Sequence, residues 1–113
     1  MFVLQPKPTF KVPVSIPTPS GVAGKFTVEF RHKGRKAFRE FVETFTADKE
    51  GDVRSDADAL DEIIADWKGV DAPYSKEALE TLLDNFPAAA RELFSAYNAA
   101  LFEGKVDNQA AKN

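Results

Sequence analysis

The spacing of apolar residues changes near Gly34, and this change constrains the fold more than any other feature of the chain. Before Gly34, apolar and polar residues alternate, as they do in a half-buried β-strand. After it, apolar residues recur at the three- and four-residue spacing of amphipathic helices. The sequence therefore predicts an α+β domain, with an N-terminal antiparallel β-hairpin followed by a bundle of three to four short helices. A chain of 113 residues is long enough for one such domain with its own core.

The predicted hairpin covers about residues 9–32. Two alternating runs, TFKVPVSI and KFTVEFRH, flank the Gly- and Pro-containing loop PTPSGVAG. Because proline cannot donate a ladder hydrogen bond, we expect Pro13 on an edge strand or facing away from its partner strand. A lone hairpin is marginal in water, so its apolar face needs a cover. We expect partial cover within one chain, leaving the rest for a partner or a second copy; full cover by the helices is the alternative. This face comprises Phe10, Val12, Val14, Phe26, Val28 and Phe30.

The helices are predicted at about residues 35–47, 56–68, 76–86 and 87–103. Ser75 precedes the third helix as an N-cap, and Ser55 or Asp56 takes this role for the second. We expect residues 1–104 to form a single domain and residues 105–113 to form a flexible tail. The four apolar stripes are Phe38, Phe41, Val42 and Phe45; Leu60, Ile63, Ile64 and Trp67; Leu79, Leu82, Leu83 and Phe86; and Leu93, Phe94, Tyr97 and Leu101.

The stretch WKGVDAPYSKEAL joins the second and third predicted helices. A DNA-reading helix pair needs a short turn and a basic recognition helix, whereas the helix that follows here, KEALETLLDNF, is acidic and would be repelled by phosphates. An active-site rim would need reactive groups that this stretch lacks. We interpret it as a joint between packed helices; a partner-facing hot spot is the alternative for Trp67 and Tyr74. The expected packing anchors are Trp67, Tyr74, Leu79, Phe86 and Tyr97.

Groups for catalysis or metal binding are scarce in this sequence. It has no cysteine, His32 is the only histidine, and no nucleotide-binding or hydrolase motif occurs. The acidic pairs Asp56/Asp58 and Asp61/Glu62 suit a solvated helix surface better than a metal or acid–base site. A net charge of −3 argues against general affinity for nucleic acid, and no apolar run reaches the length of a signal peptide or membrane span. We predict a non-enzymatic, intracellular protein without cofactor or metal.

A basic cluster, RHKGRKAFR, lies at the start of the first predicted helix. Positive charge there opposes the helix dipole, which hints at a use in binding phosphates or an acidic protein surface; a solvated turn at the start of the helix is the alternative. Acids outnumber bases from Glu43 to Asp71, and this asymmetry suits head-to-tail self-association or docking on a polar partner. The candidate partner-binding residues of the cluster are Arg31, Lys33, Arg35, Lys36 and Arg39.

The run DWKGVDAPYSKEALETLLDNFPAAARELFSAY resembles the tail assembly chaperones of long-tailed bacteriophages. The shared pattern is a Trp, a short loop with an aromatic residue and Ser, and then EAL, LL, an aromatic-Pro pair and AY at matching spacing. The beginning, FVLQPKPTFKVPVSIPTPSG followed by VEF with the basic positions after it, and the final KN are also similar. The resemblance covers nearly the whole chain, although many of the matching residues are packing and turn residues.

The resemblance implies a small cytosolic protein of an infected or lysogenic bacterium, non-enzymatic and absent from the finished virion. It would bind the tape-measure protein, keep it soluble and help recruit tail-tube subunits, and a longer, frameshifted form occurs in many members. The family has no catalytic residues to transfer. Two other functions stay open: a structural tail or head-tail completion protein, and a nucleic-acid-associated regulator that uses the basic cluster.

Overall fold

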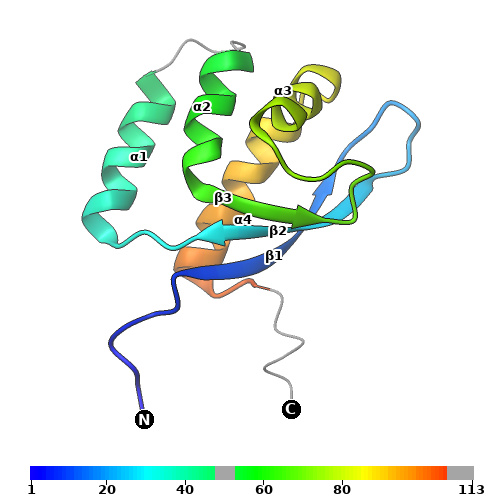
Figure 1. Cartoon of the computed structure of the whole chain (residues 1–113). Helices are drawn as coiled ribbons and strands as arrows, with labels where there is room; N and C mark the ends of the chain where they lie inside the picture. The colour runs from blue at the N-terminus through cyan, green and yellow to red at the C-terminus, as the bar shows by residue number, and fades with distance from the viewer. Residues whose placement is uncertain (48–52, 107–113) are drawn as a thin grey trace.

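A computed structural model describes residues 1–47 and 53–106 of the chain (Figure 1). The predicted α+β class is confirmed, with a hairpin first and four helices, but a third strand joins the sheet. The expected tail falls mostly on residues 107–113, which lie outside the described part. In chain order the elements are β1 (Thr9–Ile16), β2 (Gly24–Arg31), α1 (Arg35–Ala47), α2 (Val53–Ile63), β3 (Ile64–Lys68), α3 (Lys76–Asn85) and α4 (Ala89–Glu103).

The three strands form one antiparallel sheet in the order β1-β2-β3. In the hairpin, Val12 lies opposite Val28 and Pro13 opposite Thr27. The amide of His32 donates to the carbonyl of Pro8 over 2.9 Å, and hydrogen-bonded and non-hydrogen-bonded pairs alternate along an antiparallel ladder. Counting from this bond, Pro13 and Thr27 form a non-hydrogen-bonded pair, so the backbone groups of Pro13 face the free edge of β1. The sequence expectation for Pro13 is thereby confirmed.

The helix predicted over residues 56–68 is wrong in its second half. Helix α2 ends at Ile63, and β3 begins at the next residue and pairs with β2. In a regular strand, Ile64 and Trp67 would point to opposite faces of the sheet. A register shift between Glu29 and Phe30 of β2 adds one residue to β3 and lets both side chains face the core. Their three-residue spacing therefore imitates a helix.

Two capping assignments have different outcomes. Ser75 is confirmed as the N-cap of α3, because its side chain accepts a hydrogen bond from the amide of Ala78 over 3.0 Å. Ser55 and Asp56 were expected to cap the second helix, but α2 begins at Val53 and both residues lie inside its first turn. Between β3 and α3, Gly69 turns the chain with a φ of +91°, a backbone conformation that favours glycine.

The core lies between the sheet and the helices, and α4 runs behind the sheet in Figure 1. Helix α1 stands at one side of the domain and packs through Phe38 and Phe41 onto Tyr97 of α4, with ring centroids 6.1 and 5.9 Å apart. The ring of Phe30, from β2, lies 5.0 Å from the same tyrosine. Tyr97 is therefore the centre of an aromatic cluster that ties the hairpin to two helices. Over the described residues, no helix has the length and apolar character to cross a bilayer.

Candidate protein-binding surface

The apolar face of the hairpin is largely covered by the protein's own helices. Val12, Val14, Val28 and Phe30 are at most 4% exposed, because α4 packs against β1 and the side chains of the other helices close the core. These four residues therefore do not offer surface to a partner in this structure. Two members of the face, Phe10 and Phe26, remain partly exposed while packing against the core.

Arg31 of the basic cluster is an exposed residue whose guanidinium is held by backbone groups of the same chain. Its guanidinium donates from one nitrogen to the carbonyl oxygens of Asp61, Glu62 and Ile64, at 3.1, 3.4 and 2.8 Å. These carbonyls lie where α2 ends and β3 begins, and the C-terminal carbonyls of a helix lack partners within the helix. A cation there also favours the helix dipole. Arg31 thus caps α2 from the neighbouring strand.

Lys33 is also committed to an internal contact. Its ammonium lies 2.6 Å from a carboxylate oxygen of Glu62, and its side chain is only 17% exposed. Three residues of the two acidic pairs singled out in the sequence contact other side chains of the fold. Glu62 pairs with Lys33, Asp58 pairs with Lys76, and Asp61 accepts a hydrogen bond from the Tyr74 hydroxyl. The acidic surface of α2 is therefore partly neutralised by the fold itself.

Three basic residues of the cluster remain on the outer surface of α1. Arg35, Lys36 and Arg39 are exposed, and none forms an ion pair with another residue in the described part of the chain. They lie in the first turns of α1, which carries no acidic residue at its start. Positive charge at this end opposes the helix dipole, so the sequence keeps it against a small local cost.

Exposed aromatic surface lies next to these charges. Phe102, near the end of α4, is 64% exposed and packs edge-on against Phe38 of α1 with centroids 5.1 Å apart. Residues three apart are neighbours on a helix surface, and Phe38 follows Arg35 by three residues. The Phe38–Phe102 pair therefore borders the charged side of α1. We call Arg35, Lys36, Arg39 and Phe102 the α1 surface. Its composition suits a partner that offers carboxylates beside apolar side chains.

The joint around Trp67 is a packed structural unit. The indole nitrogen donates to the carbonyl of Ala72 over 2.8 Å, and the rings of Phe26 and Tyr74 pack edge-on against the indole with centroids 5.9 and 5.1 Å away. The Tyr74 hydroxyl donates to a carboxylate oxygen of Asp61 at 2.5 Å. Burial, and then this hydrogen bond, raise the pKa of Tyr74 well above its ordinary value. The phenol stays neutral and fastens the loop to α2.

The other expected anchors are divided between the core and its margin. Trp67 is 5% exposed, while Leu79 of α3 and Tyr97 of α4 are fully buried. Tyr74 and Phe86 are partly buried against the core. Burial is also the main cause that raises the pKa of Tyr97, with the nearby negative charge of Glu62 as a second cause. Both tyrosines therefore act as hydrogen-bond donors and packing groups, not as acid–base groups.

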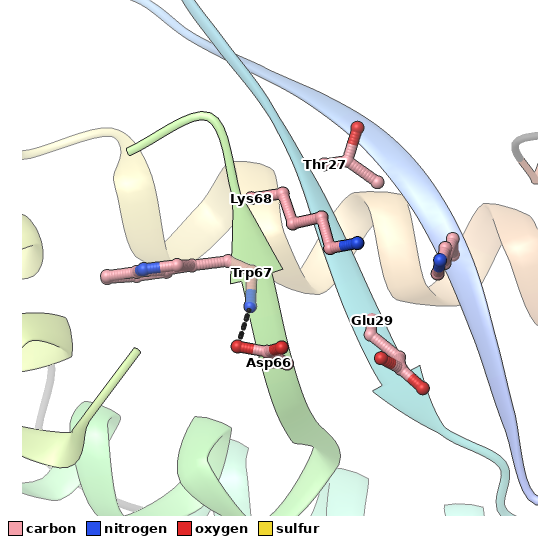
Figure 2. Close-up of a pocket in the computed structure, with 6 residues that line it drawn as sticks. Thr27, Glu29, Asp66, Trp67 and Lys68 are labelled. Atoms are coloured by element: carbon pink, nitrogen blue, oxygen red, sulfur yellow. Dashed lines mark hydrogen bonds between the residues drawn. The ribbon is translucent and has the colours of Figure 1, made fainter. Parts of the chain in front are cut away.

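The solvent face of the sheet is polar. Lys11, Thr27, Glu29, Asp66 and Lys68 line a shallow depression there, and Figure 2 shows Lys68 extending across β2 toward Thr27 and Glu29, while the Trp67 ring points away from them. Charges of both signs alternate on this face, as on an ordinary solvated sheet surface. Within the described residues, no group of three or more His, Cys, Asp or Glu side chains is placed to hold a metal ion.

The two sheet edges carry features that hinder strand addition. Pro13 removes a donor from the middle of the β1 edge. On β3, Trp67 and Val28 form a non-hydrogen-bonded pair, so the Trp67 amide faces away from β2. The Asp66 carboxylate accepts a hydrogen bond from this amide over 2.9 Å (Figure 2). The β2 side of the hairpin is occupied by β3 itself. Side-chain surfaces are therefore better candidates for partner contacts than sheet edges.

An apolar groove at one end of the domain was not foreseen from the sequence. It encloses about 340 Å³ between the end of the hairpin, the loop after β3 and the end of α3. Four separate chain segments build it, so no local sequence pattern could have marked it. Its apolar lining consists of Ile16, Phe26, Val70, Leu82 and Phe86.

Comparison with known protein families gives one match. The family model described as phage tail assembly chaperone matches residues 1–108. Searches of the curated proteins and of the solved structures found no match. The family match spans both the hairpin and all four helices, so it concerns the whole domain.

Proposed function

The chain belongs to the phage tail assembly chaperone family, and from this membership we propose that it binds the tape-measure protein, keeps it soluble and helps recruit tail-tube subunits. The role is non-catalytic, as the family is. The observation that carries the proposal is the family match over residues 1–108, which includes the hairpin and all four helices.

The α1 surface is the contact that we assign to the tail protein. A long helical partner exposes apolar stripes before assembly, and carboxylates commonly flank such stripes. The exposed cations Arg35, Lys36 and Arg39 match those carboxylates, and the exposed ring of Phe102 covers part of an apolar stripe. Such a contact is reversible, because exposed ion pairs and one aromatic anchor bind weakly, as release of the partner during assembly requires.

The chaperone role also implies where the protein acts. We propose that it works in the cytoplasm of the bacterial host and leaves before the particle is complete. A structural tail or head-tail completion protein would instead stay in the particle. Mass spectrometry of purified particles separates these two functions, since only a structural protein is retained at a fixed copy number.

Co-expression with the tape-measure protein tests the proposal. We expect the tape-measure protein to stay in the soluble fraction and to co-elute with this chain through affinity and size-exclusion steps. Without this chain it should aggregate. A co-expressed, unrelated acidic protein of similar size is the control for unspecific charge effects. Failure to co-elute at low ionic strength, where charge contacts are strongest, would contradict tape-measure binding.

A further inference from the structure

Two cations of the α1 surface form a row along the helix. Arg35 and Arg39 are four residues apart, so their side chains leave the same side of α1 with a separation of about 6 Å along its axis. Phe38 emerges beside this row, and the exposed ring of Phe102 packs on it with centroids 5.1 Å apart. The α1 surface therefore presents two guanidinium groups, one helical turn apart, next to an aromatic patch.

The charge of this row calls for carboxylates from outside the chain. Neither Arg35 nor Arg39 forms an ion pair within the described residues, and the first turn of α1 contains no acidic residue. The acids of the helix, Glu40 and Glu43, follow Arg39 and would repel carboxylates placed beside them. The acidic stretch of a matching ligand is thus limited to about two helical turns.

A helical ligand fits the row better than an extended one. On a helix, residues i, i+3 and i+4 lie on one side, so two carboxylates four residues apart and an apolar side chain at i+3 face the same way. On a strand, the residue between two that share a face points to the opposite face. A helix that lies alongside α1 repeats the spacing of Arg35 and Arg39, and each guanidinium can hold one carboxylate with two hydrogen bonds.

We propose that the α1 surface binds a helical segment with the pattern acid-x-x-apolar-acid, where acid is Asp or Glu, apolar is a large aliphatic or aromatic residue, and x is any residue. The two carboxylates pair with Arg35 and Arg39, and the apolar side chain covers the exposed ring of Phe102. This inference rests on the proposed function, which supplies a long helical partner. The pattern selects which segments of that partner the chain binds.

A second copy of this chain does not offer the pattern at its surface. Within the helices that the structure describes, the spacing occurs in α3 at Glu80, Leu83 and Asp84. The side chain of Leu83 is only 5% exposed, because it packs in the core of its own domain. A helix of another protein is therefore the occupant that we assign to the α1 surface.

Binding of short helical peptides to the purified full-length chain tests the pattern. The acidic probe is a fluorescent, side-chain-stapled peptide with two Glu four residues apart and Leu three residues after the first. The scrambled probe has the same composition, but its Leu lies on the opposite side of the helix. In the basic probe, Lys replaces both Glu. Fluorescence anisotropy at low ionic strength, where charge contacts are strongest, measures each dissociation constant.

Four variants are compared with the wild type. The charge-swapped variant carries Arg35→Glu and Arg39→Glu, and the lysine variant carries Arg35→Lys and Arg39→Lys. Phe102→Ala removes the aromatic anchor. The matched control carries Lys25→Glu and Lys68→Glu, which change the net charge as the charge swap does, at exposed positions on β2 and β3. Circular dichroism and thermal unfolding establish that each variant is folded.

The wild type should bind the acidic probe at least about tenfold more tightly than the scrambled or the basic probe. The charge-swapped variant should prefer the basic probe, because its glutamates meet the lysines. The lysine variant keeps the charge but loses the bidentate geometry, so it should bind the acidic probe roughly fivefold more weakly. Phe102→Ala should weaken binding by a similar factor, and the matched control should bind like the wild type.

Three results would overturn the proposal: equal binding of the acidic and scrambled probes, no binding of the acidic probe, or a charge-swapped variant that does not change its preference. Displacement of the acidic probe by duplex DNA at equal charge concentration would assign the surface to nucleic acid and would overturn it as well. The peptide experiment contains no tape-measure protein, so its failure leaves tape-measure binding to the co-elution experiment. Loss of co-elution with intact probe binding would contradict the proposed function alone.

Discussion

The hydroxyl of Tyr97 on α4 donates a hydrogen bond to the backbone carbonyl of Arg31, 2.8 Å away at the end of β2. The guanidinium of the same arginine caps the end of α2. One residue therefore links three elements: the strand that carries it, the helix that covers the sheet, and the helix that leads into β3. The cap also fixes where the chain changes from helix to strand.

Removal of the Tyr97 hydroxyl should destabilise the fold without changing its shape. The Tyr97→Phe substitution keeps the ring in the aromatic cluster but leaves the Arg31 carbonyl without this donor, which should lower the free energy of unfolding by about 1–2 kcal/mol. Urea denaturation measures the change. Thr81→Val is the control, because it removes a hydroxyl that bonds the Glu77 carbonyl on an exposed helix surface, and its effect should stay within about 0.5 kcal/mol. Equal effects of the two substitutions would contradict a special role for Tyr97.

The cap on α2 predicts that two arginines of the basic cluster behave differently. Arg31→Met removes the donors to the carbonyls of Asp61, Glu62 and Ile64 and should cost about 1–2 kcal/mol of stability. Arg39→Met removes the same charge from a residue that, unlike Arg31, caps no helix end, and should change stability by less than about 0.5 kcal/mol. Chemical denaturation of both variants checks this, and hydrogen exchange should show faster opening at the end of α2 in Arg31→Met only.

The hairpin and most helices were predictable because their apolar spacing is regular. Alternation marks β1 and β2, and the Ser75 cap marks the start of α3. The strand β3 was not predictable, since a bulge places Ile64 and Trp67 on one face at helical spacing. A period analysis assumes regular backbone and fails where the backbone is irregular.

The candidate binding surface was only partly predictable for a different reason. The basic cluster is contiguous in sequence, yet Arg31 and Lys33 contact groups about thirty residues later in the chain, while Arg35, Lys36 and Arg39 form no ion pair within the described residues. Which member pairs internally depends on the tertiary contact between β2 and α2, and no local pattern encodes it. The same holds for the apolar groove, whose lining comes from four segments.

Charge reversal on the α1 surface should abolish partner binding without weakening the fold. Arg35, Lys36 and Arg39 changed together to Glu would repel the carboxylates that we assign to the partner. Acidic residues near the start of a helix favour its dipole, by about 0.3–1 kcal/mol each at low salt, so stability should be unchanged or slightly higher. Co-elution with the tape-measure protein and the yield of assembled tails measure the effect, and both should fall at least tenfold.

A matched control for that reversal exists on the solvent face of the sheet. Lys11, Lys25 and Lys68 are exposed lysines on β1, β2 and β3, and changing all three to Glu alters the net charge by the same amount. This variant should bind the tape-measure protein like the wild type. If both triple variants lose binding equally, net charge and not the α1 surface decides the interaction.

The two tyrosines predict a loss of stability at alkaline pH. Burial raises the pKa of Tyr97 and of Tyr74 above the ordinary value of about 10. Because the pKa is higher in the folded state, the unfolded state releases these protons first, so this stabilisation is complete below about pH 10 and is lost as pH rises above it. The chain has only two tyrosines, so tyrosinate absorbance reports them directly. We expect that absorbance to appear together with unfolding and not before it, and Tyr97→Phe to show a shallower loss of stability between about pH 10 and 11.5. Ionisation of both tyrosines near pH 10 in a chain whose circular dichroism is still native would contradict their burial and their hydrogen bonds.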